Sequence, residues 1–494
     1  MENKRKMITK SGYMKGLQCE LAFYNWWNKI EESISESAEG RMNDGTEVGK
    51  LAQKLAPGGV DLDTLDLPIW TLAEKTKVLL ESALPIYEAT FITDIQPKLL
   101  CKVDILVPDK RGWQIWEVKA TNSVKPEHIQ DLAFQTFVLE RCGIKITKIA
   151  LVHLNKEYIR IGPLNIQKLF VVEDVIEEVR AVMVSIEEKL NQMYTNGMLS
   201  QAPHKNIGAH CNAPYACGYQ DICWKTFPEK DNIYTIPRLG KKGDYYFDSG
   251  IYHLEDLDPN ILTEKQRSVW DAHINKTIIN NKEEIISFLN DSNYPQYFLD
   301  FETINPAIPI WDNTKPYQQI PFQYSLHIIR KPNAEPEHLE FLDDASGADP
   351  RPSLSYKLIQ DLGNSGTIWT FNQSFESGRI NELSILFPEY KKELGNILNR
   401  INDLITPFRN LWYYDPAMQG SSSIKKVLPV LVPELNYENL EIGDGATAMD
   451  MFLRLVKGDS ELILKKEEIM FNLREYCKLD TWAMVKIREN LLNN

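Results

Sequence analysis

The chain has 494 residues, of which 43% are hydrophobic and 25% charged, and its formal net charge is −14. Such a composition is ordinary for a globular protein with two or three domains. The negative charge argues against a wide non-specific nucleic-acid surface, but a nuclease stays open because bound metal ions offset active-site carboxylates. No apolar segment follows the basic start MENKRKMITK, and no apolar run is long enough for a membrane span. We therefore expect a cytoplasmic protein without membrane contact.

Helices and strands alternate in the first half of the chain. Apolar and aromatic residues at helical spacing predict helices over 11–34 and 45–55. Strands are expected in IYEATFIT, KLLCKVDILVP and WQIWEVKA, and the link DKRG predicts a hairpin between the last two. A helix in KPEHIQDLAFQTFVLERCG, a strand in KITKIALVHLN and one long helix in DVIEEVRAVMVSIEEKLNQMY complete an α/β domain over residues 1–230.

The second half predicts another α/β domain after a connecting region. Residues 231–290 are mixed and polar, and RLGKKGDYYFDSG predicts a linker hairpin within them. The second domain, residues 291–494, begins at YPQYFLDFET and continues with strands in PFQYSLHIIRK, HLEFL and TIWTF. It ends with a long helix in KKEEIMFNLREYCKLDTWAMVKIRENLL.

WQIWEVKA contains two charges in a stretch that otherwise predicts a buried strand. Strand alternation places Glu117 and Lys119 on one face. Buried charges need partners, which are either each other, as an ion pair at a strand end, or a metal and a phosphate. Asp104 lies in the preceding strand, and the following helix places Gln135 on one face with Asp131. Carboxylates of this kind can hold a hard divalent cation, which activates water and polarises a phosphodiester, while a lysine stabilises developing negative charge.

This set of residues resembles the RecB-like branch of the PD-(D/E)XK nucleases. The resemblance implies that Asp104 and Glu117 bind Mg²⁺ or Mn²⁺ and that Lys119 and Gln135 are further catalytic residues. The branch often has a histidine in the helix before the strands, where GTEVGKLAQ offers Glu47 as a substitute. The glutamine of the branch's helical motif is either Gln135 or Gln130, and we prefer Gln135 because it shares a face with Asp131.

Three cysteines in HCNAPYACGYQDICW, namely Cys211, Cys217 and Cys223, lie within thirteen residues of one another. They are typical of thiolate ligands that need a fourth, and Cys19 lies far upstream. The remaining three cysteines lie in apolar contexts and are expected to be small buried hydrophobes; they are Cys101, Cys142 and Cys477.

One cysteine before the nuclease core and three after it resemble the iron–sulfur nucleases, among them the AddB-type helicase–nucleases and a CRISPR adaptation nuclease family. The resemblance implies a [4Fe–4S] cluster that Cys19, Cys211, Cys217 and Cys223 hold and that joins the two ends of the domain. Zinc is the alternative, with His204 or His210 in place of one thiolate.

A second set of carboxylates begins in YFLDFET. Asp300 and Glu302 share one face of a strand, with Phe301 directed toward the core. EYCKLDTWAM places Tyr476 and Asp480 on one helical face.

Between these motifs, TIWTFNQSFESGRINEL contributes Asn372 and Glu376, and Asp415 is expected to be a turn residue. The pattern resembles the DEDD exonucleases of the RNase H-like fold, as does the segment SSSIKKVLP before the last motif. The resemblance implies that the carboxylates bind two metal ions and that the tyrosine orients water; the ligands would be Asp300, Glu302, Glu376 (in place of an aspartate) and Asp480, beside Tyr476.

Together, the motifs resemble an uncharacterised bacterial family that fuses an iron–sulfur RecB-like nuclease to a DEDD exonuclease-type domain. The resemblance implies a metal-dependent nuclease that hydrolyses DNA at ends or on single strands, in repair or in defence against foreign DNA. Two alternatives stay open: a ribonuclease, and a nucleic-acid-binding scaffold with inactive centres. No Walker-type motif is present, so we expect any unwinding partner to be a separate helicase; a repair or defence protein is the other kind of partner considered.

Overall fold

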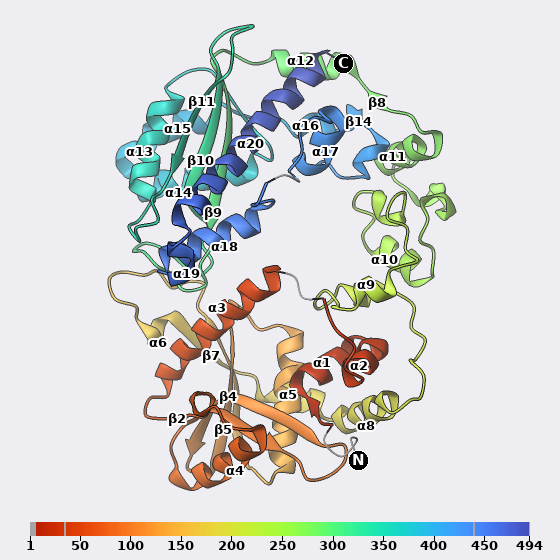
Figure 1. Cartoon of the computed structure of the whole chain (residues 1–494), viewed down its shortest axis with the longest axis vertical. Coiled ribbons are helices and arrows are strands. Elements are labelled where there is room, and N and C mark those ends of the chain that lie inside the picture. The colour runs from red at the N-terminus through yellow and green to blue at the C-terminus, as the bar shows by residue number, and fades with distance from the viewer. Residues whose placement is uncertain (1–5, 34–35, 438–439, 494) are drawn as a thin grey trace. The chain divides into compact units, whose positions relative to one another are not determined.

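Figure 1 shows a computed structural model of the chain, which describes residues 6–33, 36–437 and 440–493. The chain divides into two compact units: unit 1 comprises Met1–Thr226 and Ala307–Tyr317, and unit 2 comprises Phe227–Pro306 and Gln318–Asn494. Both units combine sheets with helices, which confirms the predicted α/β class. Of the helices described, none is both long and apolar enough to cross a membrane.

A mixed sheet lies at the centre of unit 1. Among the described residues it has seven strands in the order β2-β3-β4-β5-β6-β7, with β1 paired to β4. The predicted hairpin is confirmed, because β4 and β5 are antiparallel and Asp109 pairs with Gly112. The strands are β1 Ile8–Thr9, β2 Val60–Asp61, β3 Ile86–Ile92, β4 Leu99–Asp109, β5 Gly112–Lys119, β6 Ile146–Leu154 and β7 Phe170–Asp174.

Apolar side chains on both faces of this sheet are covered. One hydrophobic core joins the sheet to α1, α5, α7 and α8, and a second joins the opposite face to α3 and to Ala307 and Ile308. The segment 307–317 is further attached by the Tyr317 hydroxyl, which donates to the Ala120 carbonyl at 2.6 Å. The helices are α1 Lys10–Gln18, α2 Glu20–Trp27, α3 Glu36–Ala52, α4 Ile69–Leu79, α5 Pro126–Arg141, α6 Ile166–Leu169, α7 Ile176–Met183, α8 Ile186–Gly197 and α9 Gln220–Cys223.

Two predicted helices of unit 1 are each divided in two. The helix expected over 11–34 breaks at Cys19, whose backbone is extended (φ −160°, ψ 127°), and its second part ends at Trp27. The long helix expected after residue 173 breaks between α7 and α8. Periodicity alone missed both breaks, because the apolar spacing continues across them.

The main sheet of unit 2 has the order β11-β10-β9-β12-β13, and β14 pairs separately with β8. Alternation along β9 directs Tyr297, Leu299 and Phe301 into the core beneath α13, α14 and α15. The long helix α20 lies across the other face, as Figure 1 shows in dark blue. The strands are β8 Ile279–Asn280, β9 Gln296–Ile304, β10 Ile320–Ile329, β11 Glu337–Leu342, β12 Thr367–Thr370, β13 Ile401–Asp403 and β14 Tyr413–Tyr414.

The predicted linker hairpin is wrong. Its residues form α10, and the region around it packs into unit 2, where His273 Nε2 lies 2.7 Å from the Tyr414 hydroxyl. The helices of unit 2 are α10 Lys241–Asp248, α11 Glu264–Asn275, α12 Lys282–Asn290, α13 Arg351–Leu362, α14 Ser374–Leu386, α15 Lys391–Leu398, α16 Thr406–Arg409, α17 Ile424–Leu431, α18 Gly445–Val456, α19 Ser460–Ile463 and α20 Lys466–Asn493.

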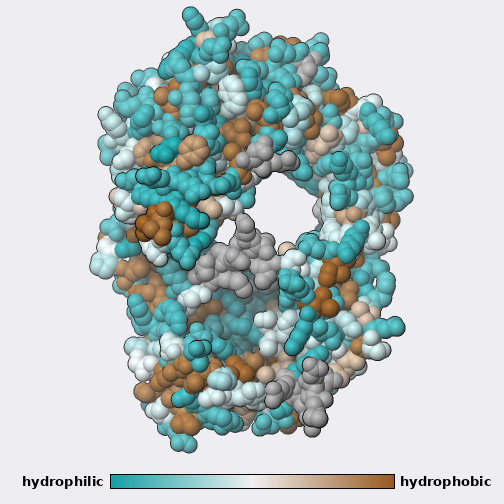
Figure 2. All heavy atoms as spheres, in the orientation of Figure 1, coloured by the Kyte–Doolittle hydropathy of each residue, from teal (hydrophilic) through white to brown (hydrophobic). Residues whose placement is uncertain are grey.

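The face drawn in Figure 2 is mainly hydrophilic, with hydrophobic side chains in separate groups. One group lies over the part of unit 1 that includes α4, where Trp70 and Val78 are exposed. Scattered exposure of this kind is normal for a folded protein.

Candidate metal centres and the cysteine cavity

Glu117, on β5, is the centre of a buried polar network in unit 1. Its side chain is 1% exposed, and its Oε1 atom lies 2.7 Å from Lys119 Nζ and 2.8 Å from Lys10 Nζ. Gln135 donates to Oε2 at 2.7 Å. We call this network site 1; its members are Lys10, Asp104, Glu117, Lys119, Asp131 and Gln135. The ion pair between Glu117 and Lys119 is therefore present, but it is buried and shared with a second lysine.

The helix α5 supplies the other side of site 1. Asp131 Oδ2 accepts a hydrogen bond from Lys119 at 2.7 Å, and Asp131 Oδ1 accepts one from Gln135 at 2.9 Å. Gln130 instead accepts from the Tyr13 hydroxyl at 3.2 Å. The preference for Gln135 over Gln130 thus agrees with the geometry, since Gln135 contacts both acidic partners.

Asp104 and Glu117 differ in how their charges are compensated. Asp104, on β4, accepts a hydrogen bond from the Val118 backbone N–H at 2.7 Å. Burial, and then the charge of Glu117, raises the pKa of Asp104 to about 8. Burial would also raise the pKa of Glu117, but Lys10 and Lys119 hold it well below its usual value. An additional cation at Asp104 would therefore lower the free energy of the ionised site.

Glu88, which the sequence analysis missed, lies directly across from Asp104. The flanking pairs Tyr87↔Ile105 and Ala89↔Val103 place it opposite Asp104 in the β3–β4 ladder. Its φ of +55° is unusual for a residue other than glycine and costs of order 1–3 kcal/mol. Burial raises the pKa of Glu88, and Lys102 opposes the rise. The only signal in the sequence was an acidic residue in the middle of an apolar strand.

Glu47, the suggested substitute for the missing histidine, is solvent-exposed in α3. The basic residue that joins site 1 from outside the predicted motif is Lys10, which comes from the N-terminal end of α1. No local pattern could have found it, because 107 residues separate Lys10 from Glu117.

A second acidic cluster lies between β9 and α20 in unit 2. Asp300 and Glu302 face α20 while Phe301 enters the core, as predicted from alternation. Ligand atoms of Asp300, Glu302 and Cys477 all lie within 4.8 Å of one another. Asp480 of α20 and Glu376 of α14 lie outside this 4.8 Å group, but their charges act on Asp300. We call the whole set site 2; its members are Asp300, Glu302, Glu376, Tyr476, Cys477 and Asp480.

The carboxylates of site 2 repel one another. Burial is the largest cause that raises the pKa values of Asp300 and Glu302 well above their usual range, and the charge of Asp480 is the next cause for both. Glu302 and Glu376 add to the rise at Asp300, and Asp444 adds to it at Glu302. Burial also raises the pKa of Asp480 to about 6 and that of Glu376 to about 8. Glu376 is 2% exposed, and its Oε2 atom has no hydrogen-bond partner among the described residues.

Three side chains that were not singled out in the sequence complete the surroundings of site 2. The Tyr437 hydroxyl donates to Asp480 Oδ1 at 2.6 Å. Lys425, which lies within the segment SSSIKKVLP, lowers the pKa values of Glu302 and Asp480 against the effect of burial. Asp444 adds negative charge near Glu302. They lie within residues 425–444, far in sequence from Asp300 and Glu302 on β9, so only the fold brings them to site 2.

Two smaller expectations have different outcomes in unit 2. Cys477, expected to be only a small buried hydrophobe, lies with its Sγ atom 4.0 Å from Asp300 Oδ2, so that expectation is incomplete. The Cys477 side chain on α20 points toward β9, where its Sγ atom lies 3.9 Å from the Asp300 carbonyl oxygen. Asp415 is a turn residue as predicted, because its Oδ1 accepts from the Ala417 backbone N–H at 2.8 Å.

The raised pKa of Glu376 predicts a pH-dependent stability in metal-free protein. In the folded chain Glu376 keeps its proton up to about pH 8, whereas in the unfolded chain it loses the proton near its ordinary pKa. The protonated side chain therefore contributes its full share of the free energy of unfolding below the unfolded pKa, and this share is lost as pH rises toward 8. Glu376→Gln keeps the shape of the neutral acid. In a chelator, we expect the variant to match the parent at about pH 4.5 and to unfold roughly 2–4 °C higher at about pH 8.5. Equal thermal midpoints at the higher pH would contradict the prediction.

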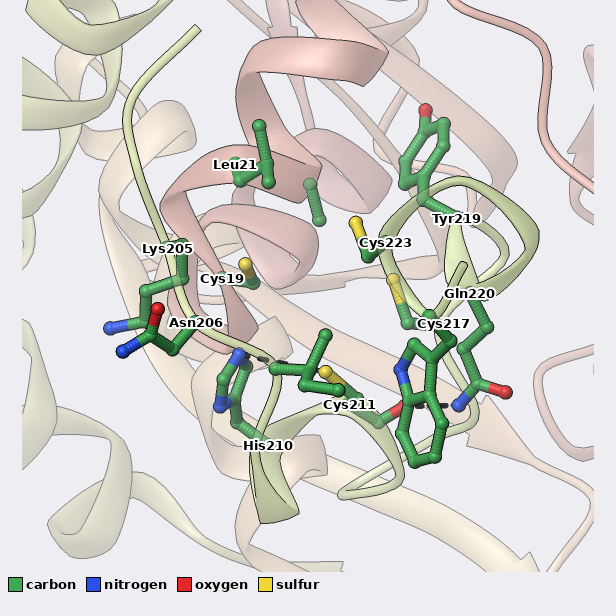
Figure 3. Close-up of a pocket in the computed structure, with 13 residues that line it drawn as sticks. Cys19, Leu21, Lys205, Asn206, His210, Cys211, Cys217, Tyr219, Gln220 and Cys223 are labelled. Atoms are coloured by element: carbon green, nitrogen blue, oxygen red, sulfur yellow. Dashed lines mark hydrogen bonds between the residues drawn. The ribbon is translucent and has the colours of Figure 1, made fainter. Parts of the chain in front are cut away.

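Four cysteines face a single cavity in unit 1 (Figure 3). Cys19 lies between α1 and α2, while Cys211, Cys217 and Cys223 come from the segment around α9. All seven cysteines of the chain lie among the described residues, and all are free thiols. We call this space the cysteine cavity; its lining includes Cys19, Cys211, Cys217, Cys223, Lys205, Ile207, His210 and Trp224.

The thiols of the cysteine cavity influence one another. Burial raises the pKa values of Cys19, Cys217 and Cys223, and the charges of the neighbouring cysteines add to the rise. At Cys19, the backbone N–H groups of Ala22 and Leu21 oppose it. His210 lines the cavity, with Nε2 3.7 Å from Cys211 Sγ, whereas His204 is solvent-exposed.

The cysteine cavity and site 1 are neighbours within unit 1. Gln18, the last residue of α1, donates to the carbonyl groups of His210 and Tyr215 at 2.7 and 2.8 Å. Tyr215 lies between Cys211 and Cys217, and its pKa is raised by burial and then by Glu127, with Lys119 of site 1 opposing the rise. The segment that carries three of the cysteines therefore also reaches toward site 1.

Comparisons with known proteins find relatives without an assigned activity. Residues 297–423, which include Asp300, Glu302 and Glu376, match a domain described as a domain of unknown function, DUF2779. The chain is 30% identical over 209 residues to an uncharacterised protein of Mycoplasma genitalium, a match that covers 38% of this chain and 31% of that protein. It is 29% identical over 213 residues to an uncharacterised protein of Ureaplasma parvum, with coverages of 38% and 30%. The chain thus spans about a third of the length of these curated relatives.

Proposed function

We propose that the chain is a metal-dependent nuclease that hydrolyses DNA phosphodiesters at ends or on single strands, with separate centres at sites 1 and 2. The observation that carries this proposal is the burial of acidic side chains whose charges are incompletely compensated in each unit. Asp104 at site 1 and Glu376 at site 2 both have pKa values raised to about 8. Buried carboxylates of this kind favour hard divalent cations with oxygen ligands.

At site 1, Asp104 and Glu117 would hold Mg²⁺ or Mn²⁺. The ion would supply activation of water and polarisation of a phosphodiester. Gln135 orients Glu117 by donating to Oε2, and Asp131 orients Lys119 at 2.7 Å. The oriented ammonium group of Lys119 would donate a hydrogen bond to a phosphate oxygen as negative charge develops there. The antiparallel strands β3, β4 and β5 followed by α5 and β6 support a PD-(D/E)XK fold for unit 1.

At site 2, Asp300, Glu302, Glu376 and Asp480 would hold divalent ions, and the unpartnered Oε2 atom of Glu376 fits a ligand role. Tyr476 would orient the attacking water. Numbered along the chain, the five strands of the main sheet have the order 3-2-1-4-5, which supports an RNase H-like fold for unit 2.

At the cysteine cavity, we propose a [4Fe–4S] cluster held by Cys19, Cys211, Cys217 and Cys223. Four free thiols around one space, of which Cys211 is buried and the other three are partly exposed, form a soft donor set that suits iron–sulfur clusters and zinc. Zinc is the alternative outcome.

We expect anaerobically purified protein to be brown, because thiolate-to-iron charge transfer absorbs visible light. Cys217→Ser should remove the colour and lower the thermal midpoint of unit 1, since one ligand is lost and the two segments that hold the cluster separate. Cys142→Ser, outside the cavity, is the control and should keep the colour. A colourless protein with stoichiometric zinc would contradict the cluster and retain only the joining role of the cysteines.

The proposed activity is tested with end-labelled single- and double-stranded DNA and RNA, incubated with the full chain in Mg²⁺ or Mn²⁺. We expect cleavage of DNA that a chelator abolishes. The double variant Glu117→Gln, Asp300→Asn should be inactive, because each centre loses a ligand. Cleavage by the double variant at the parent rate would contradict both assignments, and cleavage of RNA alone would make the chain a ribonuclease.

A further inference from the structure

Two lysines of site 1, Lys10 and Lys119, share one oxygen atom of Glu117. Their Nζ atoms lie 2.8 and 2.7 Å from Oε1. Both side chains keep part of their surface open to solvent, 30% for Lys10 and 26% for Lys119, although Glu117 itself is 1% exposed. Any divalent cation that binds Glu117 Oε1 competes with both ammonium groups for it.

The second carboxylate of the site distinguishes the two lysines. Lys119 Nζ lies 2.7 Å from Asp131 Oδ2, within hydrogen-bond distance, whereas Lys10 Nζ lies 3.6 Å from the same atom. When Glu117 Oε1 is occupied by another cation, Lys119 retains a hydrogen-bonded acidic partner. Lys10 keeps only the longer ion pair with Asp131 and the charge of Asp104, so its partly exposed ammonium group can donate a hydrogen bond to a further anion.

The backbone that carries Lys10 is held in place on both sides. Before it, β1 pairs with β4, the strand that carries Asp104, and the Thr9 side chain caps α1 by accepting from the Gly12 N–H. Within α1, Tyr13 stacks on Phe134 of α5 with ring centroids 5.1 Å apart. After it, the helix ends at Cys19 in the cysteine cavity. A lysine on so constrained a backbone is positioned for a ligand before that ligand arrives.

We propose that Lys10 binds a phosphate group of the nucleic-acid strand at site 1, as a second lysine whose role is distinct from that of Lys119. This inference rests on the proposed function and adds a substrate-binding residue to it. A lysine ammonium is a compact point charge that suits a phosphate oxygen. The phosphate is either an internal phosphodiester or a terminal phosphate, since both present the same anionic oxygens.

The test uses the full chain with Asp300→Asn and Asp480→Asn, which leave site 1 as the remaining proposed centre for Mg²⁺ or Mn²⁺. Lys10→Met removes the charge and keeps most of the side-chain length, and Lys10→Arg retains the charge. Lys50→Met is the matched control, because Lys50 is a partly exposed lysine of unit 1 that pairs with Asp61 at 2.6 Å, outside site 1. Binding of Mn²⁺ is measured by calorimetry, and binding of a fluorescent single-stranded oligonucleotide is measured by anisotropy in Ca²⁺.

We expect Lys10→Met to weaken oligonucleotide binding about 5- to 10-fold and to reduce the slope of log K against log salt by about 0.7, the value for one phosphate contact on a single strand. Affinity for Mn²⁺ should stay equal or rise, because a competing cation is gone. Lys10→Arg should keep most of the oligonucleotide affinity, and Lys50→Met should match the parent. Oligonucleotides with a 5′-phosphate, a 3′-phosphate or neither distinguish binding of a terminal phosphate from binding of an internal phosphodiester. Weaker binding of any of them by Lys10→Met supports the inference.

Three results would overturn it. Unchanged oligonucleotide binding in Lys10→Met would mean that Lys10 only neutralises Glu117. Weaker binding of both Mn²⁺ and the oligonucleotide would mean that Lys10 maintains the site's structure rather than contacting phosphate. Failure of the parent itself to bind Mn²⁺ and the oligonucleotide would contradict the proposed function, and the role of Lys10 would fall with it.

Discussion

Replacing Glu117 with glutamine is expected to reduce cleavage at site 1 by roughly 10²–10³-fold or more, the size of effect seen when one group that stabilises the transition state is removed. The amide keeps the shape of the side chain and can still accept a hydrogen bond from a lysine. It loses the negative charge that would hold a divalent ion. The measurement is the rate of cleavage of a labelled oligonucleotide in Mn²⁺, in a chain whose site 2 carries Asp300→Asn.

Glu140→Gln is the matched control, because Glu140 is also an acid of unit 1 and pairs at the surface with Arg180 at 2.8 Å. It should cleave at the parent rate. Equal rates in Glu117→Gln and Glu140→Gln would show that Glu117 has no role in catalysis.

Glu117→Ala is expected to have a second effect, on folding. As a residue that serves a bound metal and phosphate, Glu117 is predicted from sequence to be replaceable without loss of stability. The structure predicts the opposite, because Glu117 is buried and accepts hydrogen bonds from Lys10, Lys119 and Gln135. Its removal leaves two lysines with Asp131 and Asp104 as the remaining acids of the site, so the free energy of unfolding should fall by about 1–3 kcal/mol. Chemical denaturation in a chelator measures the change.

Replacing Asp300 with asparagine is expected to remove a component that trims one nucleotide at a time, and to stabilise the metal-free protein. Asp300 lies among Asp480, Glu302 and Glu376, whose charges raise its pKa after burial. Because of this raised pKa, Asp300 must take up a proton when the metal-free chain folds at neutral pH, which costs free energy. Asparagine is neutral in both states, so the stability effect has the opposite sign to that at site 1. The measurements are the product ladder from an end-labelled strand and the thermal midpoint in a chelator.

The solvent-exposed Glu335→Gln is the control for unit 2 and should change neither quantity. Because the two sites gather their ligands in separate units, the effects of Asp300→Asn and Glu117→Gln should be additive. If Asp300→Asn is silent on every DNA and RNA substrate, unit 2 is a binding scaffold. The longer side chain of Glu376, where an aspartate is usual in the resemblance, is then the first place to look for the cause.

The elements and motifs that local periodicity governs could be predicted from the sequence. A period of two along β5 and β9 places Glu117 with Lys119, and Asp300 with Glu302, on one face. The i, i+4 spacing in α5 and α20 does the same for Asp131 with Gln135 and for Tyr476 with Asp480. These relations hold whatever the rest of the chain does, because strand and helix geometry repeats within a few residues.

Only the tertiary structure decided which distant segments complete each site. Lys10 reaches Glu117 across 107 residues, and Tyr437 reaches Asp480 across 43. Glu88 takes its place through strand pairing, and residues 307–317 join unit 1 through apolar burial. Contacts of this kind depend on which buried surfaces fit together, and the entropy of closing a loop changes only slowly with its length, so spacing along the chain does not specify them.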